Sequence, residues 1–274
     1  MTMASLMGRT GLGAGVATMA MVWMPHAGAS QSWCEQDSRG EEGNHFCEVR
    51  EMTLSADDVL RVDGGQNGGV KVIGWEENEV LVRARVWAKA RSDGDAEALA
   101  DAVEVTDAGG RIRAEGPRTG RRESWGVSFE IYTPHDSDLE LEANNGGISI
   151  SDVRGQIEFR TQNGGVHLEG VGGDVRGRTQ NGGLKVELEG DSWDGAALDV
   201  ETQNGGVTID VPQGYSAEFE TGTVNGGIDL AFPITVSGRL RSNIRTTLGD
   251  GGPLVRVKTT NGGVKVRQRG SVVR

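Results

Sequence analysis

Thr161-Gln162-Asn163-Gly164-Gly165-Val166-His167-Leu168 is the stretch that decides the fold of this chain. Its Asn-Gly-Gly triplet occurs seven times, nearly always between two short strands of alternating apolar and polar residues. Three successive triplets are 18 residues apart and the next two follow after 23 and 21 residues, periods typical of solenoids and repeat arrays. The chain is therefore a repeat protein, whose repeated turns are marked by Asn67, Asn145, Asn163, Asn181, Asn204, Asn225 and Asn261.

Two folds are compatible with this local pattern. Asn-Gly between alternating strands is a strong hairpin signal, because a type I′ turn needs positive φ at both central residues, and it predicts an antiparallel meander. In the other fold, each triplet is the corner of a coil whose turns of about 18 to 22 residues stack in parallel register.

We favour the coil because stacking explains why Thr-Gln-Asn-Gly-Gly recurs. It aligns the asparagines in one column and Thr161, Thr179, Thr202 and Thr259 in another, where like side chains hydrogen-bond along the stack. Glycine supplies a tight corner without a Cβ clash. The side chains expected to point inward are Leu141, Ile148, Ile150, Ile157, Phe159, Val166, Leu168, Val175, Leu184, Val186, Leu198, Val200, Val207, Ile209, Phe219, Ile228, Leu230, Val255, Val257, Val264 and Val266.

Residues 1–29 have the pattern of a Sec-type signal peptide. A single charged residue, Arg9, precedes an apolar, glycine-rich run from Leu12 to Met24, and Ala27-Gly28-Ala29 fits the small-x-small cleavage rule. The alternative, a membrane anchor, is disfavoured because the run is shorter than the roughly 20 residues that cross a bilayer. We predict cleavage after Ala29 and a periplasmic or extracellular protein.

Cys34 and Cys47 are the only cysteines and lie in residues 30–52, just after the predicted cleavage site. In an exported protein such a pair predicts one disulfide, worth on the order of 3 kcal/mol by the chain-entropy estimate. A metal site is not expected, because two thiols with His45 nearby have no credible fourth ligand. No cofactor is expected.

The charge balance bears on the partner. The chain has 28 basic and 40 acidic side chains, so that loss of Arg9 with the signal changes the formal net charge from −12 to −13. Arg and Lys are scattered singly among Glu and Asp, which argues against a nucleic-acid partner. No later segment is apolar enough to span a membrane, so no integral membrane segment is expected in the mature chain.

The rest of the chain divides into two parts. Residues 53–130 predict a strand-rich section with one short helix at about 93–103, for which Ser92 or Asp93 is the N-cap. Residues 131–274 carry the Asn-Gly-Gly repeats and are expected to form a β-solenoid.

The order of these features resembles a known family. A secretory signal, Trp33-Cys34, Cys47-Glu48-Val49-Arg50-Glu51, the strand-plus-helix section, Tyr132-Thr133-Pro134 and the repeats together are similar to the bacterial β-strand-repeat family of putative adhesins, a domain of unknown function. The resemblance covers most of the mature chain. It implies a mainly β protein of toast-rack or β-helix type: a right-handed single-stranded parallel β-helix (β-solenoid) with a small N-terminal α+β section and no established activity.

We find no motif that predicts catalysis. His45, His135 and His167 have no serine or cysteine arrangement of a nucleophile and base. Asp136 and Asp138 follow Pro134, where short acidic residues commonly serve turn geometry. Among the aromatic residues, we expect Trp193 to project from the coil, because it sits in an insertion, Asp191-Ser192-Trp193-Asp194-Gly195.

The sequence therefore favours a non-catalytic exported β-solenoid, an adhesin or envelope-binding domain that presents repeated polar faces to a protein or glycan. One alternative is a structural module that self-associates, because Val264-Lys265-Val266 could form an exposed sheet edge. A carbohydrate-active enzyme is less favoured, since the outward positions show no repeated constellation: Ser149, His167, Lys185, Thr208, Asp229 and Lys265.

Overall fold

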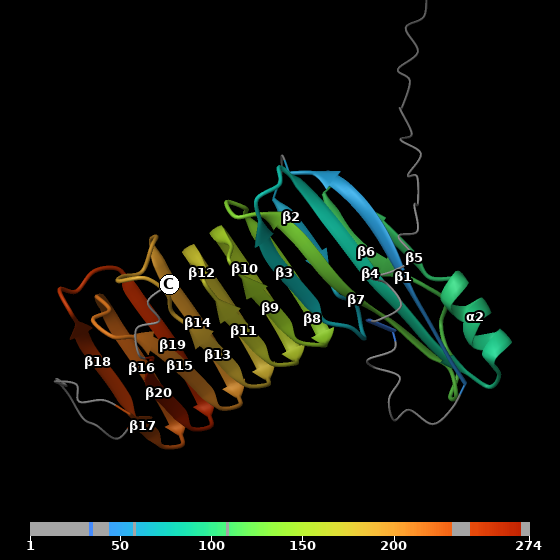
Figure 1. Ribbon diagram of the computed structural model, residues 1–274. Helices are drawn as coiled ribbons and strands as arrows, with labels where there is room; N and C mark the ends of the chain where they lie inside the picture. The colour runs from blue at the N-terminus through green and yellow to red at the C-terminus, as the bar shows by residue number, and fades with distance from the viewer. Residues whose placement is uncertain (1–32, 35–43, 57–58, 108–109, 232–241, 270–274) are drawn as a thin grey trace, which may run out of the picture.

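The computed structural model describes residues 33–34, 44–56, 59–107, 110–231 and 242–269, so the predicted signal peptide lies outside the described residues. In this part of the chain, the strands form two ten-stranded sheets that face each other along an elongated coil (Figure 1). Sheet A has the order β1 (Asn44–Ser55), β4 (Glu79–Ala90), β7 (Ser124–Pro134), β3 (Val70–Trp75), β9 (Ile148–Ser151), β11 (Val166–Glu169), β13 (Leu184–Glu187), β15 (Val207–Pro212), β20 (Val264–Arg269), β17 (Ile228–Leu230). Sheet B has the order β18 (Asn243–Leu248), β16 (Ala217–Asn225), β19 (Leu254–Asn261), β14 (Ala197–Asn204), β12 (Gly172–Asn181), β10 (Arg154–Asn163), β8 (Leu139–Asn145), β2 (Leu60–Asp63), β6 (Arg111–Glu115), β5 (Glu104–Asp107).

Each repeat forms one rung of the coil. In the rung that contains Thr161-Gln162-Asn163-Gly164-Gly165, β10 lies in sheet B and ends at Asn163. The two glycines turn the corner, and β11 continues in sheet A. The next rung stacks in parallel register, with Asn163 opposite Asn181 and Val166 opposite Leu184. The antiparallel meander is therefore wrong for the repeats, and the chain is mainly β with a solenoid-like coil.

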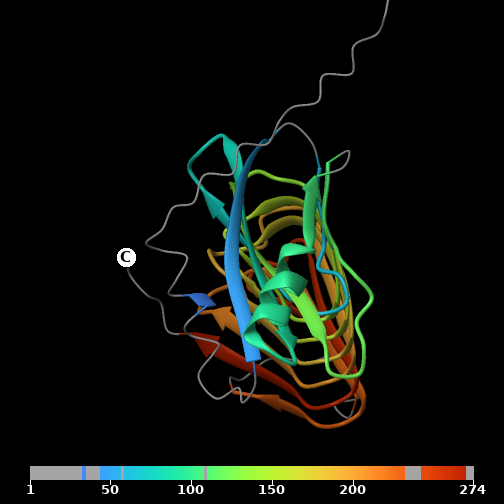
Figure 2. The same ribbon diagram turned by 90° about the vertical axis from the view of Figure 1, so that its right-hand side faces the viewer.

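The sheets are nevertheless mixed. Strand pairs are antiparallel toward the ends of the coil, at β1–β4, β4–β7, β5–β6 and β16–β18. At the N-terminal end, α2 (Asp93–Asp101) packs beside β1 and β4 (Figure 2), and the Ser92 side chain accepts a hydrogen bond from Asp95 N as its N-cap. Cys34 and Cys47, the pair expected from the sequence, form a disulfide that ties Trp33-Cys34 to β1.

The order of the rungs differs from the order of the repeats in the sequence. β19 lies between β14 and β16, and β20 lies between β15 and β17, so the last repeat occupies a place inside the stack. The edge suggested by Val264-Lys265-Val266 is therefore wrong: β20 is hydrogen-bonded on both sides, and β17 is the edge strand of sheet A.

The space between the sheets is filled by the predicted inward side chains. All of them are buried except Ile228 and Leu230, which are half-buried on β17, a strand that among the described residues pairs with β20 alone. One irregularity is compensated locally: the Phe159 ring fills the place of the side chain that Gly177 lacks on the next rung, where a Cβ would lie 2.1 Å from the ring. Core packing and corner geometry thus set one common register.

The corner asparagines form a continuous ladder across all seven rungs. Six of the seven Nδ2 groups donate to Oδ1 of the asparagine on the neighbouring rung, and the distant first copy, Asn67, takes part as an acceptor while its own Nδ2 donates to the Trp125 carbonyl. The distances are 2.9 Å for Asn163 to Asn145, Asn181 to Asn163 and Asn204 to Asn181, 2.7 Å for Asn261 to Asn204 and Asn225 to Asn261, and 3.4 Å for Asn145 to Asn67.

A second ladder lies just inside the first. The predicted alignment of the threonines is confirmed and includes a fifth member, Thr223, which the sequence analysis missed because Val224 replaces the usual Gln. The expected bonding between like side chains is wrong for this column, because the hydroxyls bond backbone carbonyls instead. These threonines are buried, and each Oγ1 donates to the carbonyl of the first corner glycine of a neighbouring rung at 2.8 to 2.9 Å: Thr161, Thr179, Thr202, Thr223 and Thr259.

The two glycines of a corner should differ in their tolerance of alanine. A Cβ on Gly164 would lie 2.0 Å from the Gly146 carbonyl oxygen, whereas a Cβ on Gly165 would lie 3.5 Å from the Gly183 oxygen, an ordinary contact. We expect Gly164→Ala to lower the free energy of unfolding by on the order of 3 kcal/mol and Gly165→Ala by about 0.5 kcal/mol or less. Urea unfolding of both variants tests this, and equal effects would contradict the stacking geometry.

Removing an asparagine from the middle of the ladder should cost more than removing one from its end. Asn181→Ala loses two side-chain hydrogen bonds, and Asn225→Ala loses one. At about 1 kcal/mol net per bond, we expect losses of about 2 and 1 kcal/mol in the free energy of unfolding. If the two variants matched the wild type in urea unfolding, the ladder would contribute nothing to stability.

Candidate functional site

The outer face of sheet B carries charged side chains in rows, because alternate residues of each strand point away from the core. The parallel register aligns these residues from rung to rung. One row runs through Glu140, Glu158, Arg176, Asp199, Arg256 and Glu220, and the next through Glu142, Arg160, Arg178, Glu201 and Lys258.

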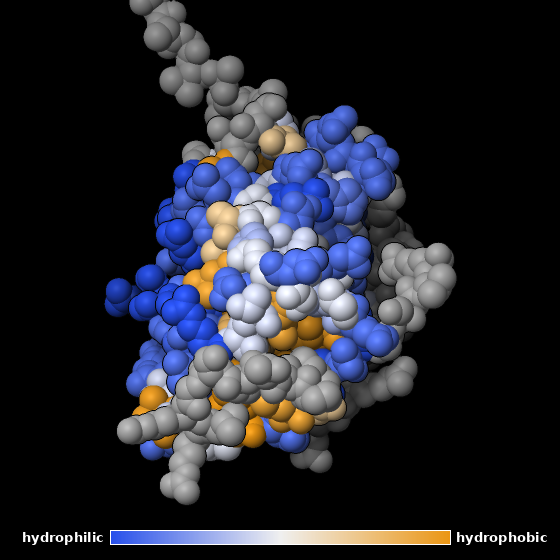
Figure 3. Space-filling model, turned by 90° about the vertical axis from the view of Figure 1, so that its left-hand side faces the viewer, coloured by the Kyte–Doolittle hydropathy of each residue, from blue (hydrophilic) through white to orange (hydrophobic). Residues whose placement is uncertain are grey.

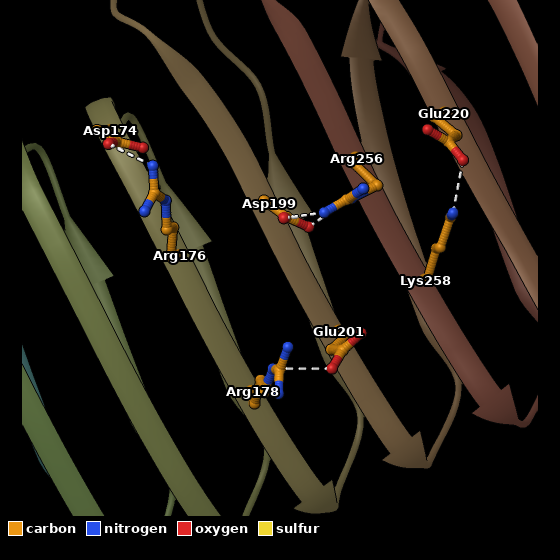
Figure 4. A network of polar contacts seen from close by, with 8 residues as sticks. All are labelled: Asp174, Arg176, Arg178, Asp199, Glu201, Glu220, Arg256 and Lys258. Atoms are coloured by element: carbon orange, nitrogen blue, oxygen red, sulfur yellow. Dashed lines mark hydrogen bonds and ion pairs between the residues drawn. The ribbon is translucent and has the colours of Figure 1, made fainter.

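Most charges on the C-terminal half of this face are paired with one another (Figure 4). Arg178 Nε lies 2.8 Å from Glu201 Oε1, and Lys258 Nζ lies 2.5 Å from Glu220 Oε1, which lowers the pKa of Glu220. Arg176 bonds Asp174 within its own strand, and Arg256 bonds Asp199. Arg178 and Glu201 are solvated, so their pair adds little stability, whereas Lys258 and Glu220 are half-buried; in every pair the side chains are already engaged.

A groove of about 710 Å³ crosses the same face from Asp63 on β2 to Thr260 on β19. Its lining includes Arg160 and a row of amides, Gln162, Gln180 and Gln203. Within the described residues, these four side chains make no hydrogen bond or ion pair. The groove therefore holds several polar groups that have no partner among the described residues, whereas Arg178 and Glu201, which also line it, pair with each other.

The outer face of sheet A holds a separate polar cluster. Ligand atoms of His167, Glu169 and Glu187 lie within 4.8 Å of one another, close enough in principle for a metal ion. Glu187, however, accepts from Lys185 Nζ at 2.5 Å, from His167 Nε2 at 2.9 Å and from Arg269. A cation would have to displace two cationic side chains, so we assign an ion-pair cluster rather than a metal centre.

The cluster perturbs its central carboxyl group. The hydrogen bond from Lys185, with smaller contributions from His167 and Arg269, lowers the pKa of Glu187 to about 2, although burial acts in the opposite direction. The sequence analysis missed this cluster because it compared one outward position per repeat. Glu169 and Glu187 occupy the next outward position, and the 18-residue period places them side by side.

The other singled-out residues have structural roles. The expectation for Trp193 is wrong: it is buried in the core, and its Nε1 donates to the Gly173 carbonyl at 3.0 Å. The insertion therefore folds onto the coil and is held there by this hydrogen bond. His135 Nδ1 lies 2.7 Å from the Asp152 carbonyl, and Asp138 accepts from Gln156 N at 2.7 Å, so both hold the turn after β7.

The C-terminal end of the coil shows apolar surface among polar side chains (Figure 3). Val224 is 72% exposed there, and Ile228 and Leu230 are half-buried on the edge strand β17. None of the helical segments that the structure describes has the length and hydropathy needed to span a bilayer.

These features define a mainly β protein whose rungs stack into a solenoid-like coil with two broad polar faces. The family model Toastrack DUF4097 matches residues 96–267, which is more than half of the chain. The chain therefore belongs to the toastrack DUF4097 family, a domain of unknown function.

The chain is also similar to solved structures. A "putative cell adhesion protein" from Clostridium sporogenes is 10% identical, with 82% of this chain and 100% of that chain covered and a TM-score of 0.40. A "putative adhesin" from Bacteroides fragilis is 10% identical, with 81% and 97% covered and a TM-score of 0.34. A "putative lipid binding protein" from Parabacteroides distasonis is 10% identical, with 82% and 98% covered and a TM-score of 0.34. No curated protein matches the chain.

The Glu187 cluster predicts a pH-dependent contribution to stability. Because the folded-state pKa of about 2 lies below the usual 4.5, ionised Glu187 stabilises the fold above about pH 4.5, and this contribution is lost as the pH falls toward 2. We expect Glu187→Gln to lower the free energy of unfolding by about 1 to 2 kcal/mol at pH 7. The difference from wild type should shrink as the pH falls below about 4.5 and vanish only when the pH reaches the folded-state pKa of about 2.

The matched control is Glu189→Gln, two residues further along and exposed, without an ion pair to any described residue. Urea unfolding at pH 7, 5 and 3 measures both variants. A Glu187→Gln effect that stayed constant over this range would show that the carboxylate charge is not responsible.

Proposed function

We propose that this protein is a non-catalytic, exported binding domain of the cell envelope that presents the sheet B groove to an extended polar partner. The carrying observation is that Arg160, Gln162, Gln180 and Gln203 line one groove and make no internal polar contact among the described residues. The rigid sheet fixes the spacing of these exposed side chains, and a ligand that binds them breaks no contact within the described fold, although ordering each side chain costs about 0.5 to 1.5 kcal/mol.

The dimensions of the groove favour a linear polymer. Its lining comes from six neighbouring strands, whose spacing of about 4.8 Å gives a span of roughly 24 Å. Three amides at successive rungs each offer a donor and an acceptor, and Arg160 lies between Glu142 and Arg178. Such a repeated set suits a glycan strand with recurring hydroxyl and carbonyl groups, and an extended protein segment is the competing partner.

The assignment as a binding protein rather than an enzyme is supported by the engagement of the histidines. His167 bonds Glu187, and His135 bonds a backbone carbonyl. Neither bonds a hydroxyl or thiol nucleophile of the described residues. Export is supported by the disulfide between Cys34 and Cys47, and N-terminal sequencing of the exported protein would test cleavage after Ala29.

We also propose that the coil is a right-handed single-stranded parallel β-helix in its repeat region, residues 131–274, and that the sections 30–52 and 53–130 complete its N-terminal end. Crossovers between parallel strands of one sheet are right-handed in the great majority of proteins. An experimental structure would test the handedness and these boundaries.

A second candidate function is a structural module that self-associates. The exposed Val224 and the edge strand β17 at one end of the coil favour it. Light scattering that shows concentration-dependent oligomers, together with no binding to envelope material, would shift the assignment to this module.

The groove proposal is tested with the exported protein against a panel of envelope glycans and detergent-solubilised membrane proteins from its own source. We expect a specific partner whose affinity falls at least about tenfold, about 1.4 kcal/mol, in the triple variant Arg160→Ala, Gln162→Ala, Gln180→Ala. The control is Thr208→Ala with Lys265→Ala, which lie in register on the outer face of sheet A. Equal loss in both variants, or no partner at all, would contradict the proposal.

A further inference from the structure

A recess of about 460 Å³ lies on the outer face of sheet A, opposite to the groove. Trp33 forms one side, and Gly147 and Gly165, the second glycines of two corners, form part of the floor. We call it the Trp33 recess. Its volume falls within the range of small-molecule sites, about 300 to 1,000 Å³.

Trp33 is fixed in place at the surface of the sheet. The disulfide of the next residue, Cys34, joins it to Cys47 on β1. The guanidinium carbons of Arg83 and Arg85 lie 5.7 and 5.4 Å from its ring centroid, within cation–π range. Arg83 is itself held by Glu51 at 2.9 Å and Glu130 at 2.6 Å. An aromatic ring positioned in this way loses little conformational entropy when a ligand stacks on it.

Polar groups line the recess beside the ring. Lys71, Ser149 and His167 are in register on β3, β9 and β11, and Ser128 comes from β7. The two serine hydroxyls make no hydrogen bond to any residue that the structure describes. His167 uses Nε2 for Glu187, which leaves Nδ1, and Lys71 bonds Glu130 at 3.1 Å while its side chain stays 51% exposed.

We propose that the Trp33 recess binds a pyranose sugar, with a C–H face of the ring against the indole and the hydroxyls toward Ser149, His167 and Lys71. An aromatic ring beside hydroxyl, imidazole and ammonium groups suits a sugar, which has both an apolar C–H face and hydroxyls. A wholly apolar ligand would cover the hydroxyls and the ammonium without pairing them, and a simple anion would have no use for the aromatic wall. The inference goes beyond the groove and does not depend on the groove's partner.

The floor provides a variant that separates binding from folding. A Cβ on Gly165 meets the Gly183 oxygen at 3.5 Å, so alanine fits the coil but adds a methyl group inside the recess. Gly206→Ala is the matched control: its Cβ would lie 3.7 Å from the Gly263 oxygen at the same corner position of a rung that does not line the recess.

The test is an NMR titration of the exported, disulfide-bonded protein with cellobiose, lactose and N,N′-diacetylchitobiose, followed through the Trp33 indole N–H and the backbone amides of Ser149 and His167. Sorbitol, a polyol without a ring face, is the negative control. We expect a saturable shift with at least one disaccharide and none with sorbitol. Affinity should fall at least about tenfold in Trp33→Ala and Gly165→Ala, stay unchanged in Gly206→Ala, and be partly retained in Trp33→Phe.

The outcomes separate this site from the groove. No saturable shift with any of the three disaccharides overturns the inference, whatever partner the groove has. Sugar binding that survives Trp33→Ala and is lost in the Arg160, Gln162, Gln180 triple variant also overturns it, because the sugar then occupies the groove. Binding lost in Trp33→Ala and retained in the triple variant supports the recess, even if the groove proves to have no partner.

Discussion

The close approach of backbone at the corners is the constraint on which the rest of the structure depends. A side chain at Gly164 would meet the carbonyl of the previous rung at 2.0 Å, so that corner stacks only when its first residue after asparagine is glycine. This approach brings the Thr161 hydroxyl to the Gly146 carbonyl and Asn163 to Asn145. Because the asparagine bonds link all seven rungs and the threonine bonds recur on five of them, register is set at the corners. A slip by one residue would break both ladders as well as exchange the inner and outer faces.

A register set by corners and core leaves the outward positions free to vary. On sheet B they carry mostly paired charges, and on sheet A they range from Ser149 to Lys185. The same stacking that makes these positions dispensable for the fold also holds them at fixed spacing. Groups from separate repeats therefore become neighbours, as with Glu169 and Glu187, and a site arises without any local sequence motif.

The sequence predicted what depends on local periodicity and could not predict what depends on the path of the chain. Asn163 opposite Asn181, and Leu168 opposite Val186, follow from the 18-residue period. The position of β19 between β14 and β16 has no local signal, because the sequence of β19 is like that of the other repeat strands. What differs is the order in which the chain connects the strands. Trp193 was misplaced for a related reason: an insertion in one repeat predicts a protruding loop, and no local signal shows that its indole is buried and donates to the Gly173 carbonyl of a neighbouring strand. The groove was not predicted because its lining combines outward positions of six strands, which no single repeat shows.

The two glycines of each corner have different physical reasons to be present. The first is required by the approach of backbone, whereas at Gly165 and Gly206 a methyl group would make ordinary contacts. At Gly69 and Gly147 a Cβ would come within 2.9 Å of a backbone oxygen, so backbone approach also favours glycine there. The second glycine nevertheless recurs in all seven copies, including those where a methyl group would fit, and keeps the rim of sheet A free of side chains. That rim is where Trp33 is held by its disulfide and by two arginines. A backbone surface without side chains beside a fixed indole leaves room for the C–H face of a pyranose to stack on the ring, so the recess points to a small cyclic ligand. The regularly spaced amides of sheet B suit a linear one.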